Sequence, residues 1–549
     1  MKPDFHPGSF LLLPFLLASA GPSLAQPNVQ PGLDLALEDT WNLNDYDHAG
    51  TFPNGASGFG AWTTCCNPGT VPVLFQAAMD PDHAFIHFIV ARESAGRLEQ
   101  ISDWSYVKHT FGSSNDPSSC GTCAGPGMFS QVEVGCSDTY ANSQAVDHYW
   151  LGPPGEIDPW TGTWDPICSH FDRGEPLVAP AQQCDGVRSL SQSQANVLNA
   201  GLNHQMRVYD ADLIVPGATY WYQAGYLVPR EAEALRENNI GSRQFTATWT
   251  GSSFAVSTFG PLLQGTILQR WAGATISSAT NGANDGRYYV AVRVTGPVAG
   301  LYHYEYAVHN RDNDRGMGGF RIPTCPGAVV TNFGFRDVDQ NAANAWSASV
   351  AGSEIQFTTP DNPLHWHSFF NFWFDSDAAP VSGIGLSLDQ FEPGPGAPTV
   401  LVTSTAPLGL YNQNLGPGCG NPSAPNLYAT GSPPRATLGN GTFGLQSAGN
   451  AASTPSPLLM SLVDGTFPLA PGCTLYSSSV ATLFPPFNAT SNGAGVASYS
   501  LPVPNVPALE GQHVDFQSAN VVAGGAYLGA FNLSRGLRVR LGNTISSCP

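Results

Sequence analysis

The sequence Leu-Tyr-His-Tyr-Glu-Tyr-Ala-Val-His at residues 301–309 alternates with a period of two. Such alternation predicts a β-strand, because successive side chains of a strand point to opposite faces. One face carries Tyr302, Tyr304, Tyr306 and Val308. The other face carries Leu301, His303, Glu305, Ala307 and His309. We expect the tyrosine face to pack in a core and the histidine face to be solvated, as in one sheet of a sandwich.

Similar segments occur on both sides of this strand. The run at residues 84–91 is apolar at every position except His87, which predicts a strand that is buried on both faces. Further strands are predicted at residues 205–213, 219–228, 243–249, 287–295, 320–322 and 366–374. One short helix is predicted at residues 230–237, because Pro229 precedes a run of good helix formers.

The composition favours the same class of fold for the whole chain. The 549 residues include 60 Gly and 46 Pro, and only 11% are charged. A hydrophobic content of 42%, with 29 Phe, 18 Tyr and 12 Trp, is too high for a disordered chain. We therefore predict an all-β protein of several β-sandwich domains, jelly-roll or immunoglobulin-like, with long loops and the one short helix.

The start of the chain has the pattern of a signal peptide. An apolar segment at residues 10–18 is followed by Ser23-Leu24-Ala25, which predicts cleavage after residue 25 and export to the extracellular space or the cell-envelope surface. Later apolar segments are too short to span a bilayer, so no integral membrane segment is expected. Three domains are predicted after the signal peptide: a Cys- and His-rich β domain at 26–250, a β-sandwich domain at 251–405 and a C-terminal β-sandwich domain at 427–549. The first domain begins with a leader at 26–60, and a linker region at 394–426 precedes the third domain.

The formal charge of −20 bears on the choice of partner. An acidic chain repels the phosphate backbone of nucleic acids, so we expect no nucleic-acid partner. The sign of the charge identifies no other partner, since solubility alone explains it.

The chain contains 11 cysteines, most of which we expect to pair in an oxidising compartment. Because the number is odd, one cysteine is expected to be free, intermolecular or a metal ligand. The adjacent Cys65 and Cys66 are expected to bond to two different partners, and Cys548 at the end of the chain is able to pair back onto it. The disulfide candidates in the body of the chain are Cys65, Cys66, Cys120, Cys123, Cys136, Cys168, Cys184, Cys419 and Cys473.

Several histidines and carboxylates are candidates for a site. Neutral imidazoles and a carboxylate bind divalent metals, and His83, His109 and Asp138 are the candidate ligands for Zn²⁺ or Ca²⁺. This interpretation requires the three side chains to converge on one point. His303 and Glu305 on the strand at 301–309, and His365 and His367 before an acidic turn at 375–377, are further candidates. For each group, ordinary polar or core residues are the simpler interpretation.

Several segments of the chain are characteristic as a set. They include Gly135-Cys-Ser-Asp-Thr-Tyr140, Tyr304-Glu-Tyr-Ala307, Gly334-Phe-Arg-Asp-Val-Asp339, Asn371-Phe-Trp-Phe-Asp375 and Leu438-Gly-Asn-Gly-Thr-Phe-Gly-Leu445. Through these segments, about residues 60–400 resemble uncharacterised secreted β-rich proteins of planctomycete-type bacteria, and residues 427–549 are similar to a C-terminal β-sandwich domain of exported proteins from such bacteria. The resemblance implies no activity that transfers to this chain.

Two functions follow from these observations. The first is a non-catalytic extracellular or envelope-associated binding or structural protein, with a glycan or cell-surface component as partner, because aromatic side chains of an exported β-protein stack on sugar rings. The second is a metal-dependent hydrolase, or another enzyme acting on an extracellular polymer through a His/Asp site. Convergence of the candidate ligands separates the two hypotheses.

Overall fold

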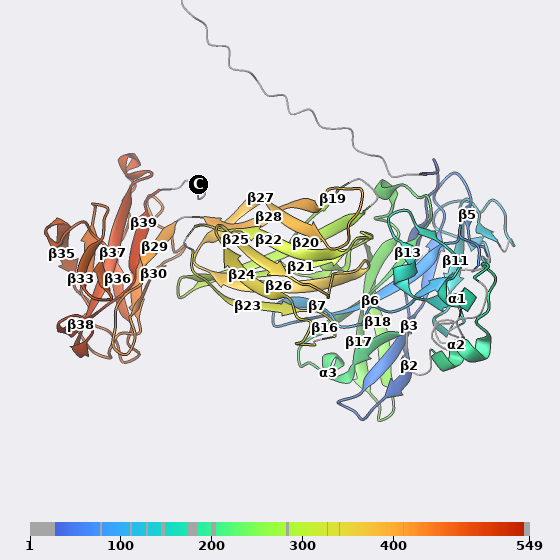
Figure 1. Ribbon diagram of the computed structural model, residues 1–549, viewed down its shortest axis with the longest axis horizontal. Coiled ribbons are helices and arrows are strands. Elements are labelled where there is room, and N and C mark those ends of the chain that lie inside the picture. Colours follow the sequence, from blue (N-terminus) through green and yellow to red (C-terminus); the bar gives the residue numbers. More distant parts are fainter. Residues whose placement is uncertain are drawn as a thin grey trace, which may run out of the picture.

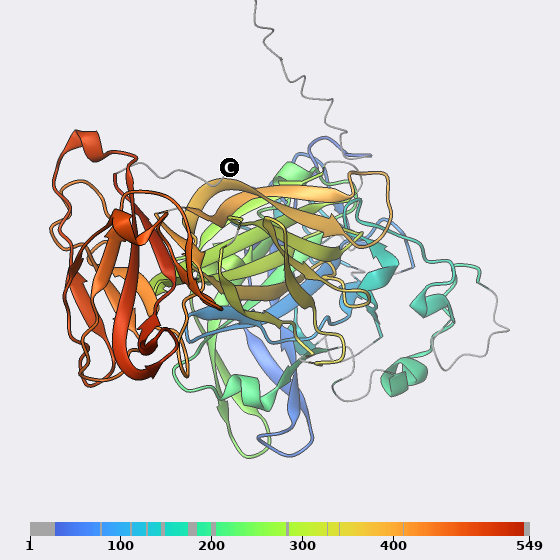
Figure 2. The same ribbon diagram turned by 60° about the vertical axis from the view of Figure 1, so that its left-hand side comes forward.

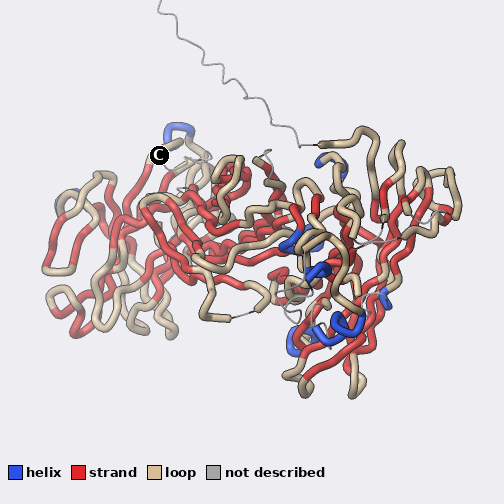
Figure 3. Tube along the Cα trace, turned by 45° about the vertical axis from the view of Figure 1, so that its right-hand side comes forward, coloured by secondary structure: helices blue, strands red, loops and turns tan. Residues whose placement is uncertain are grey.

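In the computed structural model, the chain folds mainly into antiparallel strands (Figures 1 and 3). The α-helices of the described residues are α1 (His170–Arg173), α2 (Gln192–Leu198) and α3 (Asp210–Leu213). The all-β prediction is therefore confirmed. The predicted signal peptide and Cys548 lie outside the described residues, which are 28–542 except 77–78, 110–111, 128–129, 144–148, 174–183, 199–201, 203–204, 282–284, 327, 340 and 410.

A seven-stranded sheet organises the first part of the chain. Its central strand, β6 (Phe85–Ser94), is buried on both faces over most of its length, as the apolar run predicted. Ile86, Phe88 and Val90 face one core, while Ile89 and Ala91 face another. The other strands are β12 (Leu151–Gly152), β8 (Val107–His109), β7 (Arg97–Gln100), β16 (Thr219–Leu227), β17 (Ile240–Trp249) and β18 (Phe254–Gln264).

Smaller sheets complete this part of the chain. Residues 26–60, predicted as a leader, instead supply β1, β2 and most of β3, because their apolar residues Leu33, Leu35, Leu37 and Leu43 belong to the main core. One sheet joins β1 (Ala36–Asp39), β4 (Thr63–Cys66), β11 (Cys136–Tyr140) and β9 (Asp116–Pro117). Another joins β15 (Met206–Tyr209), β3 (Ala56–Ala61) and β2 (Leu43–Ala49). The two-stranded pairs are β10 (Gln131–Val132) with β5 (Val73–Leu74) and β13 (Ile157–Asp158) with β14 (Thr163–Trp164).

The middle of the chain is a sandwich of two five-stranded sheets. Tyr302, Tyr304, Tyr306 and Val308 of β21 lie in its core, which confirms the predicted tyrosine face. One sheet is β19 (Thr275–Thr280), β20 (Arg287–Val298), β21 (Leu301–Asn310), β26 (Ser368–Ser376) and β23 (Val330–Arg336). The other is β24 (Ser347–Ala351), β25 (Glu354–Thr358), β22 (Met317–Pro323), β27 (Ala379–Gln390) and β28 (Thr399–Gly409).

Most of the opposite face of β21 is buried, so the prediction of a solvated face was wrong there, and only the end of the face at His303 is partly exposed. Glu305, Ala307 and His309 are at most 4% exposed. Ala307 packs in an apolar cluster with Ile89 of β6 and Leu98 of β7, because the seven-stranded sheet lies against this face. We call the contact between these two sheets the seam; β7 lies beside β21 and β26 along it (Figure 1).

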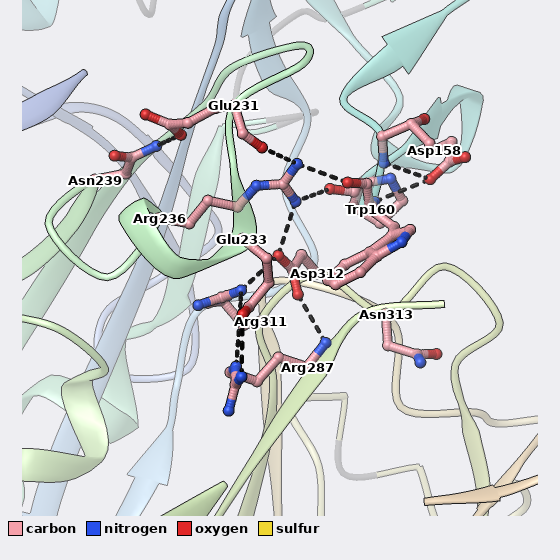
Figure 4. A network of polar contacts seen from close by, with 12 residues as sticks. Asp158, Trp160, Glu231, Glu233, Arg236, Asn239, Arg287, Arg311, Asp312 and Asn313 are labelled. Carbon is pink, nitrogen blue, oxygen red and sulfur yellow. Dashed lines mark hydrogen bonds and ion pairs between the residues drawn. The ribbon is translucent and has the colours of Figure 1, made fainter. Parts of the chain in front are cut away.

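Charged residues close one end of the seam (Figure 4). Arg236 donates to the Asp312 carboxylate at 2.9 Å and to the Trp160 carbonyl at 2.6 Å. Arg311 donates to Glu233 at 2.8 Å, and Arg287 contacts the same carboxylate. The helix predicted at 230–237 is therefore only a 3₁₀ turn, η3 (Glu233–Leu235), since its charged side chains bond across the seam.

The last part of the chain is a third sandwich, which extends from the end of the second (Figures 1 and 2). Residues 394–426, predicted as a linker region, instead contain all of β28 and β29 (Asn412–Gly416). β29 joins a sheet with β39 (Gly536–Arg540), β37 (His513–Gly525), β38 (Gly529–Leu533), β32 (Leu458–Ser461) and β35 (Leu483–Phe487). The facing sheet is β30 (Asn426–Thr430), β31 (Gly444–Ala448) and β36 (Ala497–Ser500), and β33 (Phe467–Ala470) pairs with β34 (Cys473–Leu475).

Disulfides connect most of the predicted cysteines. The bonds are Cys66–Cys120, Cys123–Cys136, Cys168–Cys184 and Cys419–Cys473, and Cys325 is also disulfide-bonded. Cys65 was expected to bond but is free and buried, with its thiol against the Asp138 carbonyl. These disulfides fit an exported protein. None of the helices in the described residues is long and apolar enough to cross a membrane.

Candidate functional site

His83 and His109 meet, but Asp138 does not join them. His83 Nε2 lies 2.8 Å from His109 Nδ1, and both rings are fully buried among Phe85, Trp164 and Phe171. Burial lowers the pKa of His83 to about 4 and holds that of His109 well below its ordinary value. Asp138 on β11 instead accepts hydrogen bonds from Ser114. The predicted three-ligand metal set is therefore not assembled.

The described residues contain one group of three side chains with the spacing of metal ligands, and it lies elsewhere. Asp464, His513 and Asp515 approach one another in the third sandwich. Arg538 donates to Asp464 at 2.8 Å and to Asp515 at 2.8 and 2.9 Å. Because a guanidinium already occupies these carboxylates, the group is an ion-pair network.

His303 and Glu305 come together at the edge of the seam, as their positions on one strand face predicted. His303 Nε2 lies 3.1 Å from Glu305, and its Nδ1 lies 2.7 Å from Asp375. The bond to Glu305, together with Asp375, raises the pKa of His303, which favours the imidazolium. Glu305 also receives a bidentate contact from Arg97 of β7. His309, on the same face, turns inward and bonds Thr266.

His365 and His367 have different surroundings, although they are only two residues apart. The His365 ring stacks on Trp104 with centroids 4.1 Å apart and an interplanar angle of 8°. His367 is 1% exposed, has a φ of 47°, and lies beside His87, with ring centroids 5.2 Å apart. His365 thus borders a cavity, whereas His367 is part of the seam.

The cavity beside His365 is the strongest candidate site. It has a volume of about 150 Å³, and we call it the tryptophan cavity. The first part of the chain contributes Asp103, Trp104 and Tyr209, and the second sandwich contributes Asp337, His365 and Phe370. Aromatic faces and carboxylates therefore line one hollow across the seam.

Asp103 has an altered acidity in this cavity. Its Oδ1 accepts hydrogen bonds from the Arg207 backbone at 3.2 Å and from the Ser105 hydroxyl at 3.0 Å. Burial nevertheless raises the pKa of Asp103 to about 6, because desolvation outweighs these bonds. Such a carboxyl exchanges protons near neutral pH, as acid–base groups and ligand-binding carboxyls do.

No family model and no curated protein matches this chain. Among solved structures, it is similar to BcpA, the major pilin subunit of Bacillus cereus, with 9% sequence identity and a TM-score of 0.17. The alignment covers 62% of this chain and 85% of the pilin chain. A likeness this low shows neither a shared fold nor a shared function, so the functional argument depends on the residues of this chain alone.

Two more cavities continue from the tryptophan cavity along the seam. The middle cavity, of about 320 Å³, shares Asp337 with it and adds Arg336 and Trp373. The arginine cavity, of about 290 Å³, shares Arg97 and Glu99 with the middle one. Consecutive cavities share lining residues, so the three lie in a row along the seam, and we call this row the seam groove.

The seam groove contains residues that the sequence did not single out. Trp104, Asp103 and Arg97 have no spacing or motif that marks a site, and their partners come from a different part of the chain. Of the residues predicted from sequence, His303, Glu305 and His365 line the groove. The signal that was available was the histidine and glutamate placed two residues apart on one strand face.

Proposed function

We propose that this is an exported, extracellular or envelope-associated binding protein, and that the seam groove binds a glycan chain. The observation that supports this function is the row of three neighbouring cavities along the seam. A linear polymer fills an extended groove better than a compact small molecule does. The third sandwich would serve as an accessory or surface-attachment domain.

The groove offers the two kinds of contact that sugars use. Trp104 and Tyr209 present aromatic rings, on which the apolar faces of sugars stack. Asp103 and Asp337 present carboxylates, which accept hydrogen bonds from sugar hydroxyls. The Trp104 ring is fixed by its stack with His365 and by its bond to the Trp366 carbonyl at 2.9 Å. A fixed ring loses little conformational entropy on binding.

Binding to a panel of plant, algal and bacterial polysaccharides tests the proposal. We expect the intact chain to retain some members of the panel, and Trp104→Ala to weaken that binding at least tenfold. Trp41→Ala is the matched control, because Trp41 is 42% exposed and lies outside the groove. Failure of the intact chain to bind any polysaccharide, or equal effects of the two variants, would contradict the proposal.

A hydrolase that acts on the same polymer is the second candidate. The raised pKa of Asp103 in the groove favours it, since a carboxyl with a pKa of about 6 can act as a general acid. The enzyme would release reducing ends from a bound polysaccharide, and Asp103→Asn would abolish the release without abolishing binding. Binding without release in the wild type leaves the non-catalytic function.

A further inference from the structure

The arginine cavity differs in charge from the rest of the molecule. It is lined by Arg92, Arg97 and Arg293, with His303 at its side, and by the carboxylates Glu99 and Glu305. The chain as a whole carries a formal charge of −20 and only 21 lysines and arginines. Asp212 and Asp375 also pair with Arg92 and His303, so cations and carboxylates are balanced around this cavity. It therefore repels an anionic ligand group less than the rest of this acidic chain does.

Two of these arginines are held in place by carboxylates. Arg92 lies 2.6 Å from Glu99 and 2.7 Å from Asp212, and Arg97 forms its bidentate contact with Glu305. The Nε of Arg92 is buried and has no hydrogen-bond partner among the described residues. The ion pairs thus fix the guanidinium groups, while one buried donor is left for a ligand to satisfy.

Arg293 is the cation that remains available. Its Nη1 donates to the Gly96 carbonyl at 2.8 Å, and no ion pair between described residues includes it. His303 stands at the side of the same cavity with a side chain that is 36% exposed. Both ring nitrogens of His303 already contact the carboxylates of Glu305 and Asp375. Arg293, which has no carboxylate within ion-pair distance among the described residues, is therefore the group suited to bind a carboxylate or sulfate.

We propose that the arginine cavity binds an anionic group, a carboxylate or a sulfate, carried by the glycan in the seam groove. The ligand is then an acidic polysaccharide, with its sugar rings against Trp104 and a charged substituent at Arg293. This inference rests on the proposed glycan-binding function, which it makes specific. It assigns to Arg293 the role of a binding residue.

The test compares the wild type with Arg293→Gln in the intact chain. The probes are neutral, uronate-containing and sulfated polysaccharides, and also free glucuronate and inorganic sulfate followed by thermal shift. We expect acidic polysaccharides to bind at least tenfold more tightly than neutral ones, and Arg293→Gln to remove most of that preference. Arg540→Gln, which makes the same change of charge outside the groove, should retain the preference.

The outcomes separate the inference from the function on which it rests. Equal binding of neutral and acidic polysaccharides, or full preference in Arg293→Gln, overturns the anionic site and leaves the glycan groove. An Arg293-dependent thermal shift with glucuronate or sulfate, without binding of any polysaccharide, supports the anion site and overturns the glycan function. A preference for uronate-containing or for sulfated polysaccharides identifies the anionic group of the ligand. A thermal shift with glucuronate or sulfate that persists in Arg293→Gln reveals an adventitious ion only, and this outcome also overturns the site.

Discussion

Arg97 forms a bidentate ion pair with Glu305 across the seam. Its Nη2 lies 2.8 Å from Oε2, its Nε contacts Oε1, and its guanidinium carbon lies 3.5 Å from the centroid of the Trp373 ring. One side chain therefore joins the seven-stranded sheet to the second sandwich and also lines two of the three cavities of the groove. The groove and the seam depend on the same contact.

Glu305→Ala should destabilise the folded chain by about 3 kcal/mol, because it leaves a partly buried guanidinium without its main partner. The Glu305 side chain is 6% exposed and the Arg97 side chain 24%. Urea denaturation followed by tryptophan fluorescence measures the loss. Glu354→Ala is the control: Glu354 and its partner Arg321 are 33% and 31% exposed, so its loss should stay below about 1 kcal/mol. Similar losses in the two variants would show that the seam does not depend on this pair.

The sequence predicted the strands better than it predicted what covers them. Residues 84–91 are apolar at every position but one, and this shows burial on both faces without any knowledge of neighbours. The alternation at 301–309 correctly identified the tyrosine face as core. The other face was assigned to solvent because it carries polar residues. The residue that compensates Glu305, Arg97, lies in a distant part of the sequence, so the local pattern could not show that this face is covered.

The candidate site was harder to predict for the same physical reason. Its cavities lie between two parts of the chain, so neither part alone shows a hollow. Asp103 and Trp104 are adjacent in sequence and resemble any loop pair until His365 and Asp337 face them. His83 and His109 were paired correctly, whereas the third expected ligand, Asp138, is on a different sheet.

Asp103→Asn should make the chain more stable at pH 7. The folded-state pKa of Asp103 is about 6, above the ordinary value of 3.8, so the folded chain holds this proton more tightly than the unfolded chain. Its contribution to stability is present below about pH 4 and is lost as the pH rises to about 6. After an allowance for solvent screening, this loss is about 1–2 kcal/mol. The gain in free energy of unfolding of the variant over the wild type should appear at pH 7 and be absent at pH 4, and the same difference at both pH values would contradict the shift.

Cys65 should be unreactive toward alkylating reagents in the folded chain. It is fully buried, and burial raises the pKa of its thiol, so little thiolate forms. Mass spectrometry after alkylation should find the Cys65 peptide unmodified under native conditions and modified in denaturant. Cys65→Ala should cost about 1 kcal/mol, because it removes one small buried atom. Rapid native labelling of Cys65 would show that the sheet of β1, β4 and β11 opens easily.

The seam should weaken in acid because of a buried histidine cluster. His87, His309 and His367 lie between the two sheets with Arg311 and Asp312 nearby. Burial lowers the pKa of His87 to about 4 and that of His309 to about 3, and it lowers the pKa of His367 well below its ordinary value of 6.5. Because these histidines have lower pKa values in the folded chain than in the unfolded chain, they contribute stability that is present above about pH 6.5. This contribution is lost as the pH falls toward their folded-state pKa values.

His367→Asn should make this acid-induced loss less steep, because one buried group no longer titrates. Asparagine tolerates the φ of 47° at this position, so the backbone need not change. Each buried histidine contributes a slope of about 1.4 kcal/mol per pH unit below pH 6. Urea denaturation at intervals between pH 6 and pH 4.5 measures the slope. His303→Gln is the control: Glu305 and Asp375 raise the pKa of His303, so it is protonated in both states within this range and its removal should leave the slope unchanged. A slope that falls in His303→Gln and persists in His367→Asn would move the acid sensitivity from the buried cluster to the groove.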